Sequence, residues 1–329
     1  MAKTFLDMEK VRQTSIKGNS LLFSPEARAK GMYKKELRDF CLPEEYSSEN
    51  IYIKIRNDAI DEFRIRKIQW HDDKNGFPSN HLCDSQVSCV NFLYPFANQP
   101  IALASLLRPF FPSLKEMLPI EDNRYVTFEW IGAENYLKEK IRKGAYRTRG
   151  ANCTSADAVV RFKSNDGTIQ IVLIEWKYTE SYQSVSLKQS KTGTDRTNIY
   201  RHLYDAASCP LNKKIIPSFD DLFFEPFYQF MRQQFLANEM EKAHELHADR
   251  VSVLHIAPRH NTDFVFITSP AFRSIDTSAT KVWKKLVAKP ERFLSVATED
   301  MFGKFDISGF PFLQDWYDYI TTRYEWVKN

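Results

Sequence analysis

The sequence predicts an α/β fold, and three observations support that class. Residues 154–162 and 169–178 form two β-type runs, separated by the short polar turn Ser164–Thr168. Residues 81–118 upstream have a helical pattern. A longer helical pattern at 225–248 is followed directly by an apolar run at 251–256. Strands that alternate with helices in this way are typical of a sheet covered by helices.

The other elements are expected on both sides of these runs. Residues 1–79 are polar with mixed charges, and 51–55 and 63–70 are plausible strands within them. Residues 71–80 have the composition of a turn or linker. The pattern further predicts two helices within 81–118 that break at Pro95 and end before Pro112, a strand at 125–131, a helix from Thr194 or Asp195 to Ala207, a strand at 264–268, and amphipathic helices at 282–296 and 312–327.

Composition narrows the function only mildly. A chain of 329 residues with 43% hydrophobic residues can bury a sizeable core, and its net charge of +4 permits nucleic-acid binding without demanding it. Five cysteines, an odd number without regular spacing, favour a reducing compartment. Since the start of the chain lacks a signal-peptide pattern and no apolar run is long enough for a membrane span, a cytoplasmic protein is expected. A homodimer is neither indicated nor excluded.

One acid in the second β-type run is the main indication of chemistry. Glu175 interrupts the apolar run 171–176, and a buried carboxylate needs a partner or a metal. Lys177 lies on the same face of the strand. With a three-residue turn and Gly167 in the left-handed conformation, Asp157 lies opposite Glu175, and the two carboxylates are suited to bind Mg²⁺. A two-residue turn would instead place Asp157 opposite Trp176.

The triplet Glu175-Trp176-Lys177 has an internal control. Asp72-Asp73-Lys74 has the same spacing of acid and base but lies in a polar turn, without a strand around it. The strand context therefore distinguishes the first triplet from a chance match. The alternative is an ordinary hairpin with a surface salt bridge between Glu175 and Lys177.

These residues resemble the motif of the PD-(D/E)xK nuclease superfamily, with Asp157 as its first acid and Glu175-Trp176-Lys177 as its (D/E)xK triplet. The proline that usually precedes the first acid is replaced by Ala156. The resemblance implies a restriction-endonuclease-like core with a mixed central β-sheet flanked by helices. It also implies that Asp157, Glu175 and the Trp176 carbonyl hold Mg²⁺, for which Mn²⁺ can substitute, while Lys177 orients or activates the attacking water.

Further residues are expected around this site. Glu129 in the strand 125–131, and Gln86 in the first helix, are candidates for indirect contact with the metal. Basic residues cluster at 138–149 and 188–201, where they could neutralise phosphates, although a solvated surface would have the same composition. The candidate nucleic-acid contacts are Arg147, Arg149, Lys188, Lys191, Arg196, Gln229 and Gln233.

The sequence thus predicts a Mg²⁺-dependent nuclease with DNA as the expected substrate. The expected parts are an N-terminal extension at 1–79 that packs on the core, a nuclease core at 80–270, and a C-terminal helical addition at 271–329. A non-catalytic nucleic-acid-binding module on the same fold and an RNA-processing nuclease are the alternatives. The histidines lack the ligand pattern of a zinc site, and nucleotide-binding and serine-hydrolase motifs are missing from the sequence.

Overall fold

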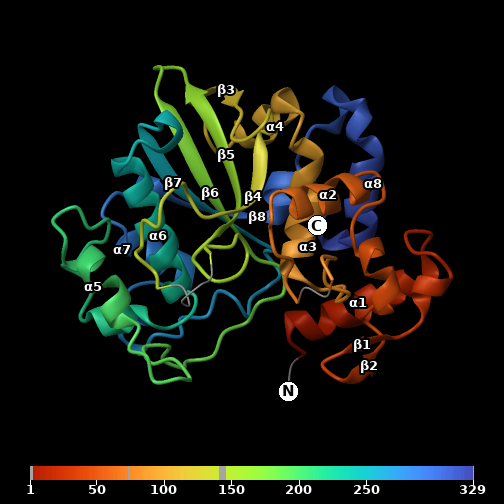
Figure 1. Cartoon of the computed structure of the whole chain (residues 1–329), viewed down its shortest axis with the longest axis horizontal. Coiled ribbons are helices and arrows are strands. Elements are labelled where there is room, and N and C mark those ends of the chain that lie inside the picture. The colour runs from red at the N-terminus through yellow and green to blue at the C-terminus, as the bar shows by residue number, and fades with distance from the viewer. Residues whose placement is uncertain (1–2, 73–74, 141–145, 329) are drawn as a thin grey trace.

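A mixed β-sheet forms the centre of the computed structural model, which describes residues 3–72, 75–140 and 146–328 (Figure 1). Its strands lie in the order β3 (Leu114–Leu118), β5 (Ala156–Ser164), β6 (Ile169–Trp176), β7 (Arg250–Ala257) and β8 (Phe293–Ala297), and β4 (Val126–Trp130) also pairs with β5. β5 is antiparallel to β3, β4 and β6, whereas β6, β7 and β8 are parallel. The expected α/β class with a mixed central sheet is confirmed.

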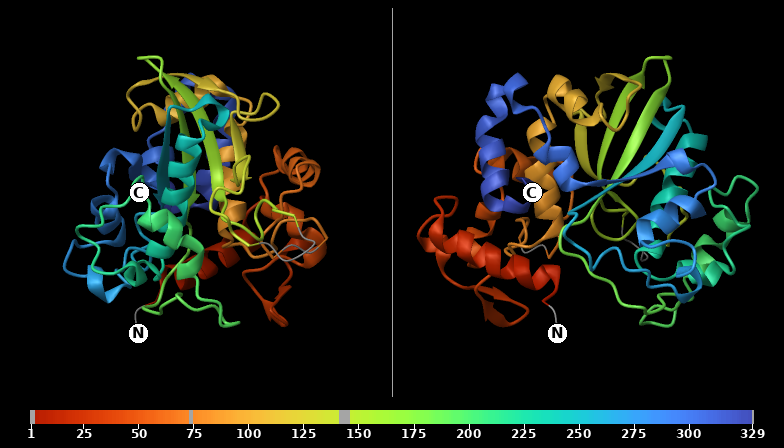
Figure 2. Two further views of the ribbon diagram at one scale, coloured as in Figure 1. Left: turned by 60° about the vertical axis from the view of Figure 1, so that its left-hand side comes forward. Right: turned by 180° about the vertical axis from the view of Figure 1, so that it is seen from behind.

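Helices cover both faces of the sheet, as the two rotated views show (Figure 2). The core on one face includes residues of α1 (Phe5–Asn19), α2 (Arg56–Ile65), α3 (Ser85–Leu93), α4 (Pro100–Leu107) and α8 (Gln314–Arg323). The core on the other face includes residues of α5 (Thr197–Asp205), α6 (Phe227–Lys242) and α7 (Ala279–Leu286). In β6, Val172 and Ile174 belong to the first core, and Ile171 and Leu173 to the second. Burial on both faces explains the nearly continuous apolar run of this strand.

The hairpin between β5 and β6 has the register that the three-residue turn predicts. Gly167 has a φ of +89°, and the Ser164 N–H donates to the Thr168 carbonyl over 2.8 Å. The ladder pairs Lys163 with Ile169 at the turn and Ala158 with Ile174 at its far end. Continuing the register by one residue places Asp157 opposite Glu175, so the two-residue alternative is wrong.

Several predicted strands are wrong. The apolar residues of these segments are buried, but the backbone there forms helix, turns or irregular structure. Residues 51–55 form bends and turns that bury Ile51 and Ile55. Of the predicted strand 63–70, the first residues end α2, where Ala59 and Phe63 share a buried face, and the rest form a turn and an extended segment. Residues 264–268 form turns and irregular backbone.

The C-terminal part also differs from the prediction. The expected helix 282–296 divides into α7 and the parallel strand β8, because Pro290 cannot continue a helix and Phe293–Ala297 pairs with β7. The sequence pattern also missed α1 and β3. The division of the chain at residues 79 and 270 stays a prediction.

The N-terminal segment lies against the C-terminal end of the chain. Arg12 of α1 pairs with Glu325 over 2.8 Å, and the Gln13 side chain donates to the Arg323 carbonyl. A short hairpin of β1 (Gly31–Tyr33) and β2 (Glu36–Arg38) follows α1. These contacts hold the N-terminal segment in a fixed position beside the sheet.

Candidate active site

Three acidic residues occupy neighbouring positions on three adjacent strands. The β4–β5 ladder pairs Phe128 with Ala158 and Trp130 with Ala156, so Glu129 lies opposite Asp157. Asp157 in turn lies opposite Glu175, and Glu175 is paired with His255 of β7. The sheet topology therefore brings Glu129, Asp157 and Glu175 into one row.

Glu175 and Lys177 form a buried ion pair. The Lys177 Nζ lies 2.5 Å from the Glu175 Oε1, and the two residues are 4% and 1% exposed. Within the described residues, neither Glu175 oxygen makes a hydrogen bond of regular geometry. Burial would lower the pKa of Lys177, but Glu175 and the other anionic groups nearby outweigh it and raise this pKa well above its usual value. The alternative of a surface salt bridge is wrong, because the pair is inside the protein.

The Asp157 carboxylate lies where β5 and β6 stop pairing. Its Oδ2 accepts a hydrogen bond of 2.7 Å from the backbone N–H of Trp176. Burial and then the facing Glu175 raise the pKa of Asp157 well above its usual value. The site thus holds two carboxylates that repel each other and a cation bonded to only one of them.

These residues fit a divalent cation. Glu175 has carboxylate oxygens that lack regular hydrogen bonds, and Asp157 faces it from the next strand. Oxygen donors of this kind suit Mg²⁺, which keeps several water ligands and needs only one or two carboxylates from a protein. The described part of the chain contains no group of three or more His, Cys, Asp or Glu side chains arranged as a metal cluster. A site here would therefore be built from two carboxylates, a backbone carbonyl and water.

Glu129 and Gln86 meet beside Asp157. The Gln86 Nε2 donates to the Glu129 Oε1 over 2.7 Å, and the Ser155 hydroxyl donates to Oε2 over 2.6 Å. Burial raises the pKa of Glu129, although these two hydrogen bonds oppose the shift. Glu129 also has a φ of +50°, a conformation that L-residues rarely adopt and that functional sites often contain. Both of its oxygens are already hydrogen-bonded, so any contact with a metal would replace one of these partners.

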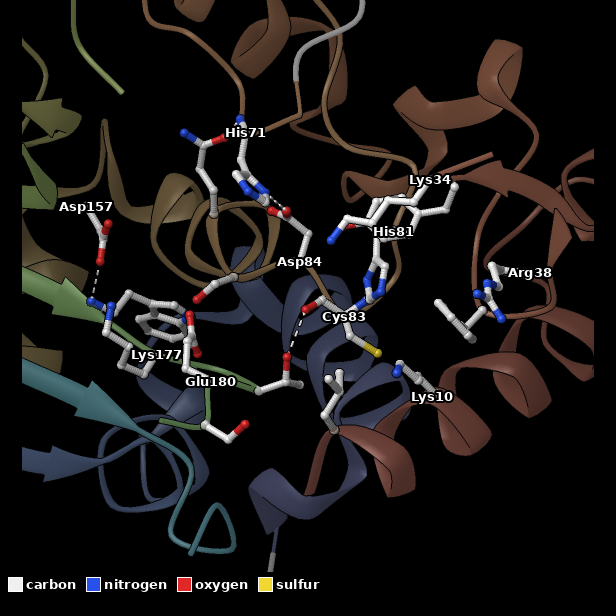
Figure 3. A pocket seen from close by; sticks show the side chains of 18 of the residues that line it. Lys10, Lys34, Arg38, His71, His81, Cys83, Asp84, Asp157, Lys177 and Glu180 are labelled. Atoms are coloured by element: carbon white, nitrogen blue, oxygen red, sulfur yellow. Dashed lines mark hydrogen bonds and ion pairs between the residues drawn. The ribbon is translucent and has the colours of Figure 1, made fainter. Parts of the chain in front are cut away.

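A cavity of about 690 Å³ opens beside this row. Asp157, Lys177 and Glu129 line one end, and Figure 3 shows Lys10, Lys34 and Arg38 at the opposite end. Between them lie His71, His81, Cys83 and Asp84. The residues at the opposite end and in the middle of the cavity were not predicted from the sequence, because they lie in a part of the chain more than seventy residues before Asp157.

The basic residues expected to contact nucleic acid do not line this cavity. Arg149 donates to the Phe128 and Glu129 carbonyls and pairs with Glu121 over 3.0 Å. Arg147 donates to the Ile131 and Gly132 carbonyls. Both guanidinium groups therefore serve to hold the strand end of β4. Residues 141–145 of this basic stretch, like Asp73 and Lys74 of the control triplet, lie outside the described residues.

The second basic stretch lies elsewhere on the protein. Lys188 pairs with Asp220 over 2.7 Å, Arg196 donates to the Leu187 carbonyl, and Lys191 is exposed. None of the three is among the residues that line the cavity. Their expected contact with phosphates stays a prediction.

The two glutamines of α6 differ in their surroundings. Gln233 is buried, and its Nε2 donates to the Ser155 carbonyl over 2.6 Å, two residues from Asp157. Gln229 accepts a weaker hydrogen bond of 3.4 Å from the Tyr182 hydroxyl. Gln233 is therefore placed to hold the strand that carries Asp157.

His255 completes the row but carries no charge. Burial and the nearby Lys177 lower the pKa of His255 to about 3, and its ring stacks on Phe264 at 4.8 Å. Its Nδ1 lies 3.0 Å from the Ser295 hydroxyl. A neutral, packed imidazole therefore lies next to Glu175 on β7.

The comparison with protein families agrees with this geometry. A family model described as "Restriction Endonuclease associating with ARP" matches residues 12–325. The curated proteins and the solved structures that were compared with the chain gave no match. No helix among the described residues is long and apolar enough to cross a membrane. Because the family model covers nearly the whole chain and the strands carry the facing acids of the nuclease motif, the protein belongs to this restriction-endonuclease family.

Proposed function

We propose that the protein is a Mg²⁺-dependent nuclease that hydrolyses phosphodiester bonds, with DNA as its substrate. The observation that carries the proposal is the pair of facing carboxylates, Asp157 and Glu175. Lys177 forms an ion pair with Glu175, and both Lys177 and Asp157 line the cavity. Family membership supports the nuclease class. The five cysteines, an odd number without regular spacing, support a reducing, cytoplasmic location.

Each residue has a distinct role in the proposed reaction. Asp157, Glu175 and the Trp176 carbonyl would hold Mg²⁺, or Mn²⁺ in its place. A bound divalent ion supplies Lewis acidity at the scissile phosphate and lowers the pKa of a coordinated water. Glu129 and Gln86 would keep Asp157 and its strand in position through the hydrogen bonds around Ser155.

Lys177 would orient the attacking water, because in its metal-free pair with Glu175 it carries its own proton. Its pKa is raised well above the usual value, so the ammonium group is protonated at neutral pH. A protonated lysine can donate hydrogen bonds and stabilise the negative charge that develops on the phosphate, but it cannot act as a general base. With a divalent ion held at this site, the Glu175 carboxylate would be shared between the ion and Lys177.

Two other functions use the same fold. A non-catalytic nucleic-acid-binding module would bind without cleaving, and an RNA-processing nuclease would cleave RNA in preference to DNA. The phosphate chemistry at Asp157 and Glu175 is the same for both sugars, so substrate tests must separate them.

The test is a cleavage assay on supercoiled plasmid, linear duplex DNA, single-stranded DNA and RNA, each with Mg²⁺, with Mn²⁺ and with EDTA. We expect metal-dependent cleavage of DNA by the wild-type protein. The variant Asp157→Asn, purified identically, is the control for contaminating nucleases. Cleavage that persists in this variant, or binding without cleavage on every substrate, would contradict the proposal.

A further inference from the structure

The β1–β2 hairpin has an unusual turn. The ladder pairs Tyr33 with Glu36, so the turn consists of Lys34 and Lys35 alone, and their φ angles are +49° and +68°. Two-residue hairpin turns with positive φ at both positions favour Asn-Gly, because other L-residues are strained there. Two lysines in this conformation are thus less stable than the residues that such turns usually contain.

Other contacts fix this strained turn in position. The Asn80 side chain donates to the Met32 carbonyl over 3.0 Å, and the Tyr33 ring meets the His81 ring edge-on at 4.8 Å. The Gly31 N–H donates to the Cys41 carbonyl. The hairpin is therefore anchored to the segment that forms the middle of the cavity. Strain that is held in place by surrounding contacts is often associated with function.

Lys34 lines the same cavity as Asp157 and Lys177, and in Figure 3 its side chain extends from the hairpin toward His81. Its side chain has no ion-pair partner among the described residues. The cations nearer the catalytic end are compensated, since Lys177 pairs with Glu175 and His71 with Asp84. Lys34, at the hairpin end of the cavity, thus differs from these cations in lacking an ion-pair partner among the described residues.

Two further cations lie at the same end of the cavity, each beside an exposed carboxylate. Lys10 of α1 lies over the Phe40 ring at 5.0 Å, with its nearest carboxylate, that of Asp7, at 3.8 Å. Arg38 pairs with the exposed Glu36 of its own strand. Exposed pairs of this kind contribute little and can exchange for a stronger anion.

We propose that the β1–β2 hairpin binds the phosphodiester backbone of the nucleic-acid substrate, with Lys34 at its tip as the principal contact. The inference rests on the proposed nuclease function and adds a second contact with the substrate, away from the candidate active site. A strand that reaches Asp157 and Glu175 through the cavity passes the hairpin, where each phosphate it presents carries one negative charge. The contact is independent of base sequence and lies away from the reacting atoms.

The turn itself offers a test that separates charge from folding. Changing Lys34→Asn together with Lys35→Gly removes both charges but installs the residues that this turn conformation favours. The double variant should be at least as stable as the wild-type protein in thermal unfolding. A matched control removes two adjacent, exposed lysines that do not line the cavity, by Lys213→Gln with Lys214→Gln.

Binding is measured by fluorescence anisotropy of a labelled DNA duplex and of the same strand alone, in Ca²⁺ over a range of salt concentrations. We expect the hairpin variant to bind several-fold more weakly, with the slope of log K against log salt reduced by about one for each phosphate that the variant no longer neutralises. Its single-turnover rate at saturating protein should stay near the wild-type value. The Lys213 and Lys214 control should keep both affinity and slope.

The outcomes separate the inference from the function on which it rests. Wild-type protein that neither binds nor cleaves nucleic acid would contradict the proposed function, and the inference with it. Wild-type binding and cleavage, with an unchanged salt slope in the hairpin variant, would overturn the inference alone. An equal weakening of binding in the hairpin variant and in the control would also overturn it, since the effect would then reflect net charge.

Discussion

Asp157 accepts a hydrogen bond from the backbone N–H of Trp176, the residue between Glu175 and Lys177. In the regular ladder, this N–H would bond to the backbone of β5, but the described pairing ends at Ala158 and Ile174. The Asp157 side chain thus replaces a backbone acceptor where the two strands separate. The same carboxylate therefore both ends the ladder and faces Glu175.

The first prediction concerns this carboxylate pair. Asp157→Asn keeps an oxygen for the Trp176 N–H, and Glu175→Gln keeps the size of the side chain, but each removes a negative charge needed for a divalent ion. We expect single-turnover cleavage in Mg²⁺ to fall by roughly two orders of magnitude or more. Asp157→Asn should fold at least as well as the wild-type apo protein, because one of two repelling buried charges is removed.

The control for this experiment is Asp318→Asn, which changes an exposed acid on α8. It should leave the cleavage rate unchanged. Turnover near the wild-type value in either site variant, at matched Mg²⁺, would remove Asp157 or Glu175 from the proposed reaction.

The second prediction separates a catalytic Lys177 from a structural one. In Lys177→Met, substrate affinity in Ca²⁺ should persist while the single-turnover rate in Mg²⁺ falls by roughly two orders of magnitude, because the lysine acts mainly in the transition state. Without metal the variant should lose about 3 kcal/mol of stability, since Glu175 becomes an unpaired buried charge. Ca²⁺ should restore more stability to the variant than to the wild-type protein.

Calorimetry of the Lys177→Met variant, with and without Ca²⁺, measures the predicted change in stability. Single-turnover kinetics on the same preparation measure the predicted loss of rate. A variant that cleaves at the wild-type rate would refute the catalytic role. A variant that Ca²⁺ fails to stabilise would indicate that Glu175 does not bind the metal.

The candidate catalytic motif could be predicted from sequence because its information is local. A single acid in a buried strand, a glycine at the correct place in a short turn and an acid on the preceding strand fix the register that brings Asp157 opposite Glu175. The sequence also indicated Glu129 as a candidate, but it did not place this acid opposite Asp157. Glu129 reaches Asp157 only because β4 pairs with the outer edge of β5, which is a property of the sheet topology.

The less local features were predicted poorly. Phe63 lies in a segment with strand-forming residues, yet its burial comes from a helix face packed on Trp70, with which its ring stacks at 3.8 Å. Arg149 appears in a basic run that suggests nucleic acid, but tertiary contacts with Glu121 and the β4 backbone use its guanidinium group. Lys34 lies far from the motif in sequence, so its place in the same cavity depends entirely on the fold.

The third prediction follows from the contacts of Arg149. Arg149→Gln should lower the free energy of unfolding by about 2 to 3 kcal/mol, because it breaks a mostly buried ion pair and several hydrogen bonds to β4. Lys191→Gln, at an exposed position, should change it by less than about 0.5 kcal/mol. Chemical denaturation of both variants is the measurement. If Arg149→Gln were as stable as the wild-type protein but bound DNA more weakly, the result would support the nucleic-acid contact that the sequence suggested for Arg149.

The fourth prediction concerns pH and the pair of His71 and Asp84. The His71 Nδ1 lies 2.7 Å from the Asp84 Oδ2, and this hydrogen bond raises the pKa of His71 from 6.5 to about 9, with smaller contributions from Asp72 and Glu129. A histidine whose pKa is higher in the folded state stabilises the fold fully below its unfolded pKa. That contribution is lost as the pH rises through the folded pKa.

We therefore expect the stability difference between wild-type protein and His71→Asn to be largest below about pH 6.5 and to shrink as the pH rises toward 9. The difference should stay below about 1 kcal/mol, because the His71 side chain is largely exposed and solvent screens the pair.

His81→Asn is the matched control: burial lowers the pKa of His81 to about 4, so the folded protein keeps His81 neutral throughout this pH window. Because only the unfolded state protonates His81 near and below pH 6.5, replacing His81 should give the opposite trend, a gain in stability relative to the wild-type protein at the acid end of the range, and a difference that is constant above about pH 7.5. Thermal unfolding of the three proteins from pH 6 to pH 9 measures both effects. A stability difference for His71→Asn that is constant over this range would show that His71 is uncharged at neutral pH, and that the cavity carries one positive charge fewer between its two ends.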